Sequence, residues 1–108
     1  MTAPARDLEE LLSPRFFKAL SDPSRLSLLR QLACSCGPTT VGQVAGCCLL
    51  NFSVVSRHLA TLRDAGILKA EKRGKEVYYT FQVTPVVAQL RALADALEAC
   101  CPPSRKED

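Results

Sequence analysis

The chain of 108 residues contains no tryptophan, one methionine and a single histidine, and aromatic residues make up only 6% of it. It has no apolar run long enough to cross a bilayer, so we expect no membrane-spanning helix and no membrane partner. The first residues lack the apolar stretch of a secretion signal, which predicts a cytoplasmic protein. One histidine cannot supply the several imidazoles that zinc and nickel sites commonly use.

The charge balance of the chain is mild. Fourteen Lys and Arg stand against eleven Asp and Glu, a net charge of +3 at pH 7. This excess permits DNA binding without proving it, and a dimer would double it. Hydrophobic residues at 47% and charged residues at 23% are typical of an ordinary globular protein. The length suits one domain, which we place over residues 1–108.

Three helices are predicted in the first half of the chain. The first covers residues 7–20, and Pro14 should bend or restart it because proline lacks an amide donor. The second opens with the capping residues and proline at 21–23, and its expected apolar stripe is Leu26, Leu29, Ala33 and Cys36. Thr39 or Thr40 caps a short third helix, whose expected apolar positions are Val41, Val44, Ala45 and Cys48.

A fourth helix, expected over residues 53–65, carries most of the functional information. Val55, Leu59 and Leu62 lie on one buried stripe. The opposite face carries short or hydrogen-bonding side chains: Ser53, Val54, Arg57, Ala60 and Thr61. Such a face fits a major groove about 12 Å wide, although it could also be merely solvated. Ser53 is the expected N-cap, and Gly66 should take the left-handed conformation that ends the helix.

A β-hairpin is predicted over residues 67–81, since two runs of β-forming residues flank a charged turn at Gly74. Its tip carries Lys72, Arg73 and Lys75. A short helix, a turn and a polar-faced helix make a helix-turn-helix, and a hairpin directly after it is a wing placed to touch DNA phosphates. The expected fold class is mainly α with a small β-hairpin, a winged helix-turn-helix.

The last helix is expected over residues 85–101, opened by Pro85, with residues 102–108 as a flexible tail. Its expected apolar stripe is Val86, Leu90, Leu93, Ala94 and Leu97. Apolar side chains outside the winged core are expected to be buried by a partner, and a second copy of the chain is the simplest candidate. We therefore expect a homodimer joined through this helix.

Three segments resemble the ArsR/SmtB family of small dimeric winged-helix repressors. They are KALSDPSRL at residues 18–26, VSRHL with LRDAGIL at 55–59 and 62–68, and RGKEVYY at 73–79. The resemblance covers roughly residues 16–98 in the family's order and spacing. It implies a homodimer that binds an inverted repeat in a double-stranded DNA operator and leaves it when an inducer, commonly a metal ion, binds.

The resemblance also implies which side chains meet DNA. By position, Ser53, Val54, Ser56 and Arg57 lie nearest the bases, while Arg73 and Lys75 belong to the wing. Thr61 shares the outer face of the reading helix. His58, at the flank of the buried stripe, is interpreted as a packing or phosphate-contacting residue and not as a metal ligand.

The family's inducer sites carry over only in part. One group of arsenite sensors begins its third helix with Cys-Val-Cys, but Thr40, Gly42 and Ala45 stand at the equivalent places, so that site is absent. The zinc site on the last helix is rejected too, because Asp95 and Glu98 are not followed by a histidine. Other arsenic sensors carry a cysteine pair at the end of the last helix, which Cys100 and Cys101 resemble.

Six cysteines form three close pairs: Cys34 with Cys36, Cys47 with Cys48, and Cys100 with Cys101. Cys36 and Cys48 also fit the interpretation of cysteine as a small buried hydrophobe. Adjacent cysteines on a helix point about 100° apart, so both rarely face one core, and thiolates suit soft ions. We predict As(III) or another thiophilic ion at the C-terminal pair, with Cys47 and Cys48 as the second candidate.

Other inducers and functions stay open at this point. Hg(II), Cd(II) and Pb(II) also prefer thiolates, and a thiol redox or persulfide sensor would cross-link Cys34 or Cys36 to Cys100 or Cys101. An enzyme is not expected, because Cys34-Ser35-Cys36 is not Cys-x-x-Cys and neither a βαβ pattern nor a phosphate-cradling loop is present. In the expected mechanism, inducer binding changes the spacing of two reading helices that otherwise lie about 34 Å apart.

Overall fold

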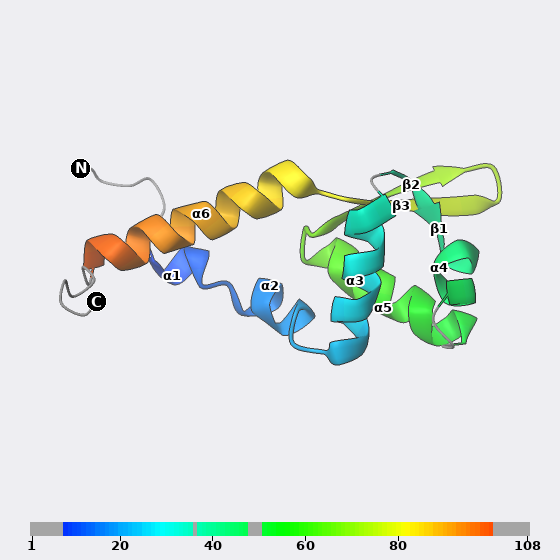
Figure 1. Cartoon of the computed structure of the whole chain (residues 1–108), viewed down its shortest axis with the longest axis horizontal. Coiled ribbons are helices and arrows are strands. Elements are labelled where there is room, and N and C mark those ends of the chain that lie inside the picture. The colour runs from blue at the N-terminus through cyan, green and yellow to red at the C-terminus, as the bar shows by residue number, and fades with distance from the viewer. Residues whose placement is uncertain (1–7, 36, 48–50, 101–108) are drawn as a thin grey trace.

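The computed structural model describes residues 8–35, 37–47 and 51–100. Its helices are α1 (Leu8–Leu11), α2 (Pro14–Ala19), α3 (Pro23–Ser35), α4 (Val41–Cys47), α5 (Phe52–Asp64) and α6 (Val83–Cys100). Its strands are β1 (Thr39–Thr40), β2 (Leu68–Arg73) and β3 (Glu76–Phe81). In Figure 1, α3, α4 and α5 gather beside the small sheet, while α6 and α1 extend away together as an arm. This is the predicted fold class, mainly α with a β-hairpin.

Proline divides the N-terminal helical segment as predicted. α1 ends at Leu11, and α2 begins with Pro14 in its first turn. The Ser13 hydroxyl caps α2 by accepting a hydrogen bond from the amide of Phe16 at 3.3 Å. Proline costs nothing in a first turn, where its missing N–H would have no helical partner.

The stripe predicted for α3 is wrong at two of its positions. Leu28 and Leu32 are the buried leucines of this helix, whereas Leu26 is 47% exposed and Ala33 is exposed. Leu29 packs partly against the core, and Cys36 lies outside the described residues. Apolar residues occupy more than half of the circumference of α3, so spacing alone offers two candidate stripes and tertiary contacts choose between them.

Two helix starts are set by side chains that accept backbone amides. Thr40 caps α4 as predicted: its Oγ1 accepts from the amide of Gln43 at 3.2 Å, and Gln43 Oε1 accepts in return from the Thr40 amide at 2.9 Å. For α5 the predicted cap, Ser53, is wrong. Asn51 takes this role, with Oδ1 accepting from the amide of Val54 at 2.9 Å.

The end of α5 follows the prediction for Gly66. This glycine has a φ of +83°, and its amide donates to the carbonyl of Arg63 at 2.9 Å. The amide of Ile67 donates to the carbonyl of Leu62 at 3.0 Å, which completes a Schellman motif. The chain is thereby turned out of α5 and directly into the hairpin.

The predicted hairpin is present, and a third strand joins it. β2 and β3 pair antiparallel from Leu68 opposite Phe81 to Arg73 opposite Glu76, around a turn where Gly74 has a φ of +63°. The strand missed from the sequence is β1, whose two residues pair with β3 on its other edge. Two residues are too few to show the alternation by which strands are recognised.

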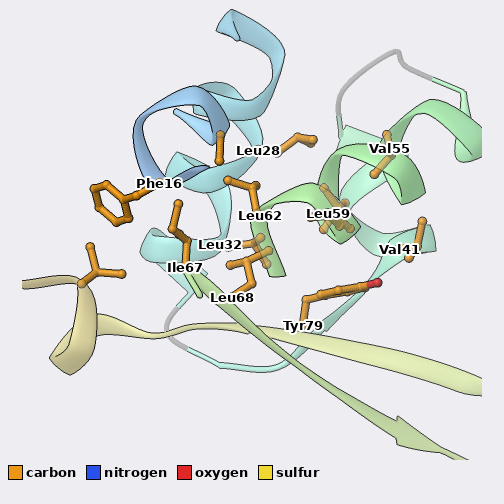
Figure 2. Packing of buried hydrophobic residues seen from close by; sticks show 13 residues of the cluster. Phe16, Leu28, Leu32, Val41, Val55, Leu59, Leu62, Ile67, Leu68 and Tyr79 are labelled. Atoms are coloured by element: carbon orange, nitrogen blue, oxygen red, sulfur yellow. The ribbon is translucent and has the colours of Figure 1, made fainter. Parts of the chain in front are cut away.

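The core confirms the buried stripe of α5. Val55, Leu59 and Leu62 are completely buried. Figure 2 shows them among side chains of α3, of the sheet and of the segment entering it, including Leu28, Leu32, Ile67 and Tyr79. Burying one face of α5 in this way leaves its opposite face directed outward.

α6 begins at Val83, two residues before the predicted start, with Pro85 in its first turn. Of its expected apolar stripe, Val86 and Leu93 are buried while Leu90, Ala94 and Leu97 are exposed. α6 packs against α1. None of the helices in the described ranges combines the length and apolar character that a membrane crossing requires.

Candidate nucleic-acid interface

The outer face of α5 is formed by residues that the sequence assigned to DNA. Ser53 and Arg57 are exposed, and Val54, Ser56 and Thr61 are half-buried. Because Asn51 caps the helix, the Ser53 side chain has no capping role and is directed outward from the first turn. The face therefore offers hydroxyl and guanidinium donors on a helix whose other side is fixed in the core.

Two of the predicted residues come together between α5 and the wing. Ser56 and Lys75 line the same hollow of about 440 Å³. Gly42 of α4 and Phe52 at the start of α5 line it as well. Residues nineteen positions apart in the chain thus border one surface, which Glu76 also lines.

The wing tip is basic, but its residues differ in how they are held. The Arg73 guanidinium pairs with Glu71 at 3.1 Å and lies over the ring of Tyr78, 4.9 Å from its centroid. Both partners of this ion pair are more than half exposed, so it contributes little and can exchange for a phosphate. Lys72 and Lys75 are exposed.

His58 lies at the contact between α3 and α5. Its Nδ1 is 3.3 Å from Nη1 of Arg25, and its side chain is half-buried. Arg25 also donates from Nε to the Ala19 carbonyl at 2.8 Å and from Nη2 to the Lys18 carbonyl at 3.1 Å. The geometry supports a packing role for His58 and reveals Arg25, which sequence reasoning did not single out, as the residue that links α2, α3 and α5.

Asp22 caps the helix that carries Arg25. Its Oδ1 accepts from the amide of Ser24 at 2.7 Å, and its Oδ2 lies 3.8 Å from the Arg25 guanidinium. The Ser24 amide is the main cause that lowers the pKa of the Asp22 carboxyl below its ordinary value, and the positive charge of Arg25 acts in the same direction. The negative form of Asp22 is thus favoured at the start of α3.

A second hollow borders α5 on the side away from the wing. The Thr61 hydroxyl donates to the Arg57 carbonyl at 3.1 Å, one turn back along the helix. Thr61 also lines a hollow of about 590 Å³, together with Ala19, Asp64 and the three basic residues Arg15, Lys18 and Arg25. Sequence reasoning missed these bases, because their nearness to α5 depends on how α2 packs.

The cysteines are distributed over distant parts of the molecule. Cys34 is exposed near the end of α3, and Cys100 is exposed as the last residue of α6. Cys47 ends α4, but its side chain, like Cys36, Cys48 and Cys101, lies outside what the structure describes. Figure 1 shows α4 and the C-terminal end of α6 at opposite ends of the molecule. Among the described side chains, no three metal-ligating groups converge.

Comparisons with known proteins agree with this arrangement. Residues 22–70 match the family described as bacterial regulatory protein, arsR family. A transcriptional repressor SmtB homologue from Synechocystis sp. is 36% identical over 87 residues, a match that spans 77% of this chain but only 61% of that protein. The arsenic resistance transcriptional regulator ArsR1 from Pseudomonas putida is 34% identical over 97 residues, 86% of this chain and 75% of that protein. A probable mercury resistance operon repressor from Streptomyces lividans is 38% identical over 85 residues, 79% of this chain and 66% of that protein.

A solved structure extends the likeness over the whole chain. The homodimeric winged helix-turn-helix DNA-binding domain of a possible ArsR-family regulator from Mycobacterium bovis superposes with a TM-score of 0.64 at 26% identity. The match covers 100% of this chain and 99% of that one. The chain therefore belongs to the ArsR/SmtB family of winged helix-turn-helix proteins, which are DNA-binding transcriptional regulators and not enzymes.

Proposed function

We propose that this protein is a homodimeric repressor that binds an inverted-repeat operator through α5 and the wing, and that a thiophilic ion held by cysteine thiolates releases it. As(III) or Sb(III) is the first candidate inducer. The observation that carries the DNA-binding part is the division of α5 into a completely buried stripe and an outer face of hydroxyl and guanidinium groups beside a basic wing. We further propose that it acts in the cytoplasm.

The division of labour on DNA follows from the chemistry of the exposed groups. Ser53, Ser56 and Arg57 can donate to base edges in a major groove, where an α-helix fits. Lys75 and Arg73 reach phosphates, which fix the position of the protein without reading sequence. α5 has 13 residues, so about 20 Å of helix is available to lie in the groove.

The proposed dimer rests on a row of uncovered apolar side chains along α6. Val83, Val87, Leu90 and Leu97 are between 37% and 55% exposed and follow each other at spacings of four, three and seven residues. That spacing places them on one helix face, with the exposed Ala94 between the last two. Such a row on an arm that stands away from the core suits a second copy of the chain. The homodimeric relative from Mycobacterium bovis supports this reading.

The proposed inducer site is the cysteine pair at the end of α6. The exposed Cys100 thiol is available to an ion, and Cys101 follows it directly in the chain. Soft ions prefer thiolates, and their coordination drives the thiols to deprotonate. As(III) takes three thiolates in a pyramid, so a third ligand from another cysteine would complete the site. The arsenic resistance regulator among the relatives favours this ion, whereas the mercury operon repressor keeps Hg(II) as an alternative.

The place of Cys100 also supports a route from the ion to the DNA. It ends the same helix that carries the exposed apolar row, so coordination there can change how two α6 helices pack. A changed packing alters the spacing of the two α5 helices, which must be about 34 Å to match successive major grooves. A coupling of about 1–3 kcal/mol, or roughly 5- to 150-fold in affinity, is typical of allosteric proteins.

Two alternatives act through other cysteines. Cys47 ends α4, the first helix of the helix-turn-helix, so an ion held by Cys47 and Cys48 would act on the DNA-binding unit directly. A redox or persulfide sensor would join Cys34 or Cys36 to Cys100 or Cys101. Cys34 lies near the end of α3 and Cys100 at the end of α6, and within one protomer these two helix ends lie far apart in Figure 1. A bond between these two cysteines therefore requires either two protomers or a rearrangement.

The test is fluorescence anisotropy of a labelled duplex from the protein's own promoter region, titrated with the full-length protein. As(III), Sb(III), Hg(II), Cd(II), Pb(II) and a persulfide donor are then added in turn. The variants are Cys100→Ser/Cys101→Ser and Cys47→Ser/Cys48→Ser, with Cys34→Ser as a control. We expect As(III) to release the wild type while the C-terminal double variant binds DNA equally well and is not released.

The other possible results of this titration either identify a different sensor or contradict the proposal. If every ion still releases the C-terminal double variant normally, that pair is not the sensor, and loss of response in the Cys47 and Cys48 variant would identify the second pair. Release by persulfide alone, with a mass consistent with a cross-link at Cys34, favours the redox alternative. A wild-type protein that stays monomeric and ignores the duplex contradicts the whole proposal.

A further inference from the structure

Basic residues border the outer face of α5 on each side. A helix in a major groove lies between two phosphate strands, one along each wall of the groove. On one side of α5, Lys75 of the wing borders the hollow that Ser56 also lines, with Glu76 beside it in the same lining. On the other side, Arg15, Lys18 and Arg25 border the hollow that Thr61 lines. The wing can contact only one of these two phosphate strands of the DNA.

The charge of this second hollow is positive. Its three bases face one carboxylate, that of Asp64. Arg63 already neutralises that carboxylate through two hydrogen bonds of 3.0 and 2.9 Å to Asp64 Oδ1. The hollow is also open to solvent at Arg15 and Lys18, both of which are exposed.

The three bases are not equally available. Arg25 is engaged by two backbone carbonyls, by His58 and by Asp22, so its guanidinium is a structural link. For the side chains of Arg15 and Lys18, the described part of the chain provides neither an ion pair nor a hydrogen bond. These two residues are therefore the ones free to neutralise an external anion.

α2, which carries both residues, is held firmly in place. Phe16 and Ala19 on its inner side are buried in the core. The carbonyls of Lys18 and Ala19 are fixed by Arg25, which itself contacts His58 of α5. A base on such an anchored helix can contribute a phosphate contact at a defined place relative to α5.

We propose that Arg15 and Lys18 bind the phosphate strand that runs along the wall of the major groove opposite the wing. This rests on the proposed function, since α5 must enter the groove. In Figure 1, α2 lies between α5 and the arm formed by α1 and α6, while the wing extends on the other side. In a dimer joined through α6, the phosphates bound by α2 therefore lie toward the centre of the operator and those bound by the wing lie outside.

The experiment measures how operator affinity depends on salt. Full-length wild type, Arg15→Ala, Lys18→Ala and the double variant are titrated onto the operator and onto an unrelated duplex between about 50 and 200 mM salt. Each lost phosphate contact should reduce the slope of log K against log salt by about 0.9. The proposed homodimer loses two contacts in each protomer, so across that range the wild type should lose roughly 150-fold more affinity than the double variant. The difference should be the same on both duplexes, because phosphate contacts carry no sequence information.

Arg30→Ala is the matched control. Arg30 is exposed on α3, two positions from each of the buried residues Leu28 and Leu32 and hence on the face turned away from the core. The substitution Arg30→Ala removes one positive charge and leaves the residues that line the hollow unchanged, so the salt slope of this variant should equal that of the wild type. The charge-preserving variant Arg15→Lys/Lys18→Arg should keep most of the slope, which separates a charge effect from a folding defect.

The outcomes are distinguishable. A wild type that binds the operator, with a double variant of unchanged slope, overturns the role of α2 and leaves the proposed function intact. A wild type that binds neither duplex contradicts the proposed function first, and the role of α2 with it. Phosphate-ethylation interference gives an independent check, because the double variant should lose interference only at phosphates on the side of each half-site nearer the operator centre.

Discussion

Nη1 of Arg25 lies 3.3 Å from Nδ1 of His58, and this contact ties the first turn of α3 to the middle of α5. Because the same guanidinium donates to the Lys18 and Ala19 carbonyls, one side chain sets the relative positions of α2, α3 and α5. His58 directly follows Arg57, the exposed base of the proposed reading face. The contact thus connects the placement of that face to the packing behind it.

Replacing His58 should test this connection. His58→Ala removes the acceptor for Arg25 and should lower the free energy of unfolding by about 1 kcal/mol, the usual net contribution of one hydrogen bond. His58→Asn offers an amide oxygen close to the place of Nδ1 and should retain much of that stability. Urea denaturation at a fixed protein concentration measures the difference. Equal destabilisation by both variants would show that ring packing, and not the hydrogen bond, is what matters.

A pair of leucines on α3 tests the corrected stripe. Leu28→Ala should lower the free energy of unfolding by about 2–5 kcal/mol, because Leu28 is completely buried and its loss leaves a cavity. Leu26→Ala, on the same helix but 47% exposed, should cost less than about 1 kcal/mol. The free energies of unfolding are measured by urea denaturation. If both variants lose a comparable amount, the apolar stripe predicted from the spacing, which includes Leu26, is the correct one.

The difference between what the sequence predicted and what it missed has a physical cause. Features decided within a few residues were predicted: the break at Pro14, the Thr40 cap, the left-handed Gly66 and the turn at Gly74. The amphipathic α5 was predicted as well, since only one of its faces is apolar. Features that depend on distant segments were missed or wrong, because local spacing carries no information on which face of α3 meets α5 or where β1 pairs.

The residues of the candidate site show the same difference between local patterns and contacts that depend on packing. The residues of α5 and the wing could be proposed from the sequence because they form continuous patterns in the chain. The basic hollow was not, since Arg15 and Lys18 come close to Thr61 only through the packing of α2. The Ser53 cap was wrong because Asn51, two residues earlier, is an equally good capping residue and the sequence does not rank them.

Asn51 offers a local test of where α5 begins. Asn51→Ala should lower the free energy of unfolding by about 1 kcal/mol, because the Val54 amide loses its acceptor. Asn51→Ser keeps a capping oxygen and should be close to the wild type. Ser53→Ala should leave stability unchanged within about 0.5 kcal/mol, since Ser53 does not cap the helix. If thermal or urea unfolding shows that Ser53→Ala loses more stability than Asn51→Ala, then Ser53 caps the helix, as the sequence predicted.

Stability should depend on pH through Asp22. The pKa of its carboxyl is lowered below the ordinary value of 3.8, so the carboxylate stabilises the folded state above that value. This contribution is lost as the pH falls through the lowered pKa of the folded state. Asp22→Asn keeps an acceptor for the Ser24 amide but does not titrate. The stability advantage of the wild type over this variant should therefore shrink as the pH is lowered from about 6 to about 2, and a constant difference would exclude the carboxylate as its cause.

Replacing Arg57 should weaken operator binding without changing the stability of the protein or its response to an inducer. Arg57→Ala should weaken operator binding by roughly 5- to 150-fold for each half-site, the equivalent of about 1–3 kcal/mol for each guanidinium at a base edge, and should affect an unrelated duplex less. Arg57 is exposed on α5, which lies far from the C-terminal end of α6 in Figure 1, so unfolding and the relative response to an inducer should stay as in the wild type. Arg57→Lys keeps the charge but loses the planar pair of donors, so it should recover non-specific affinity and not discrimination. Arg30→Ala again provides the matched loss of one charge, and anisotropy with both duplexes gives the two affinities. If Arg57→Ala and Arg30→Ala bind the operator equally well, the outer face of α5 is not the surface that reads DNA.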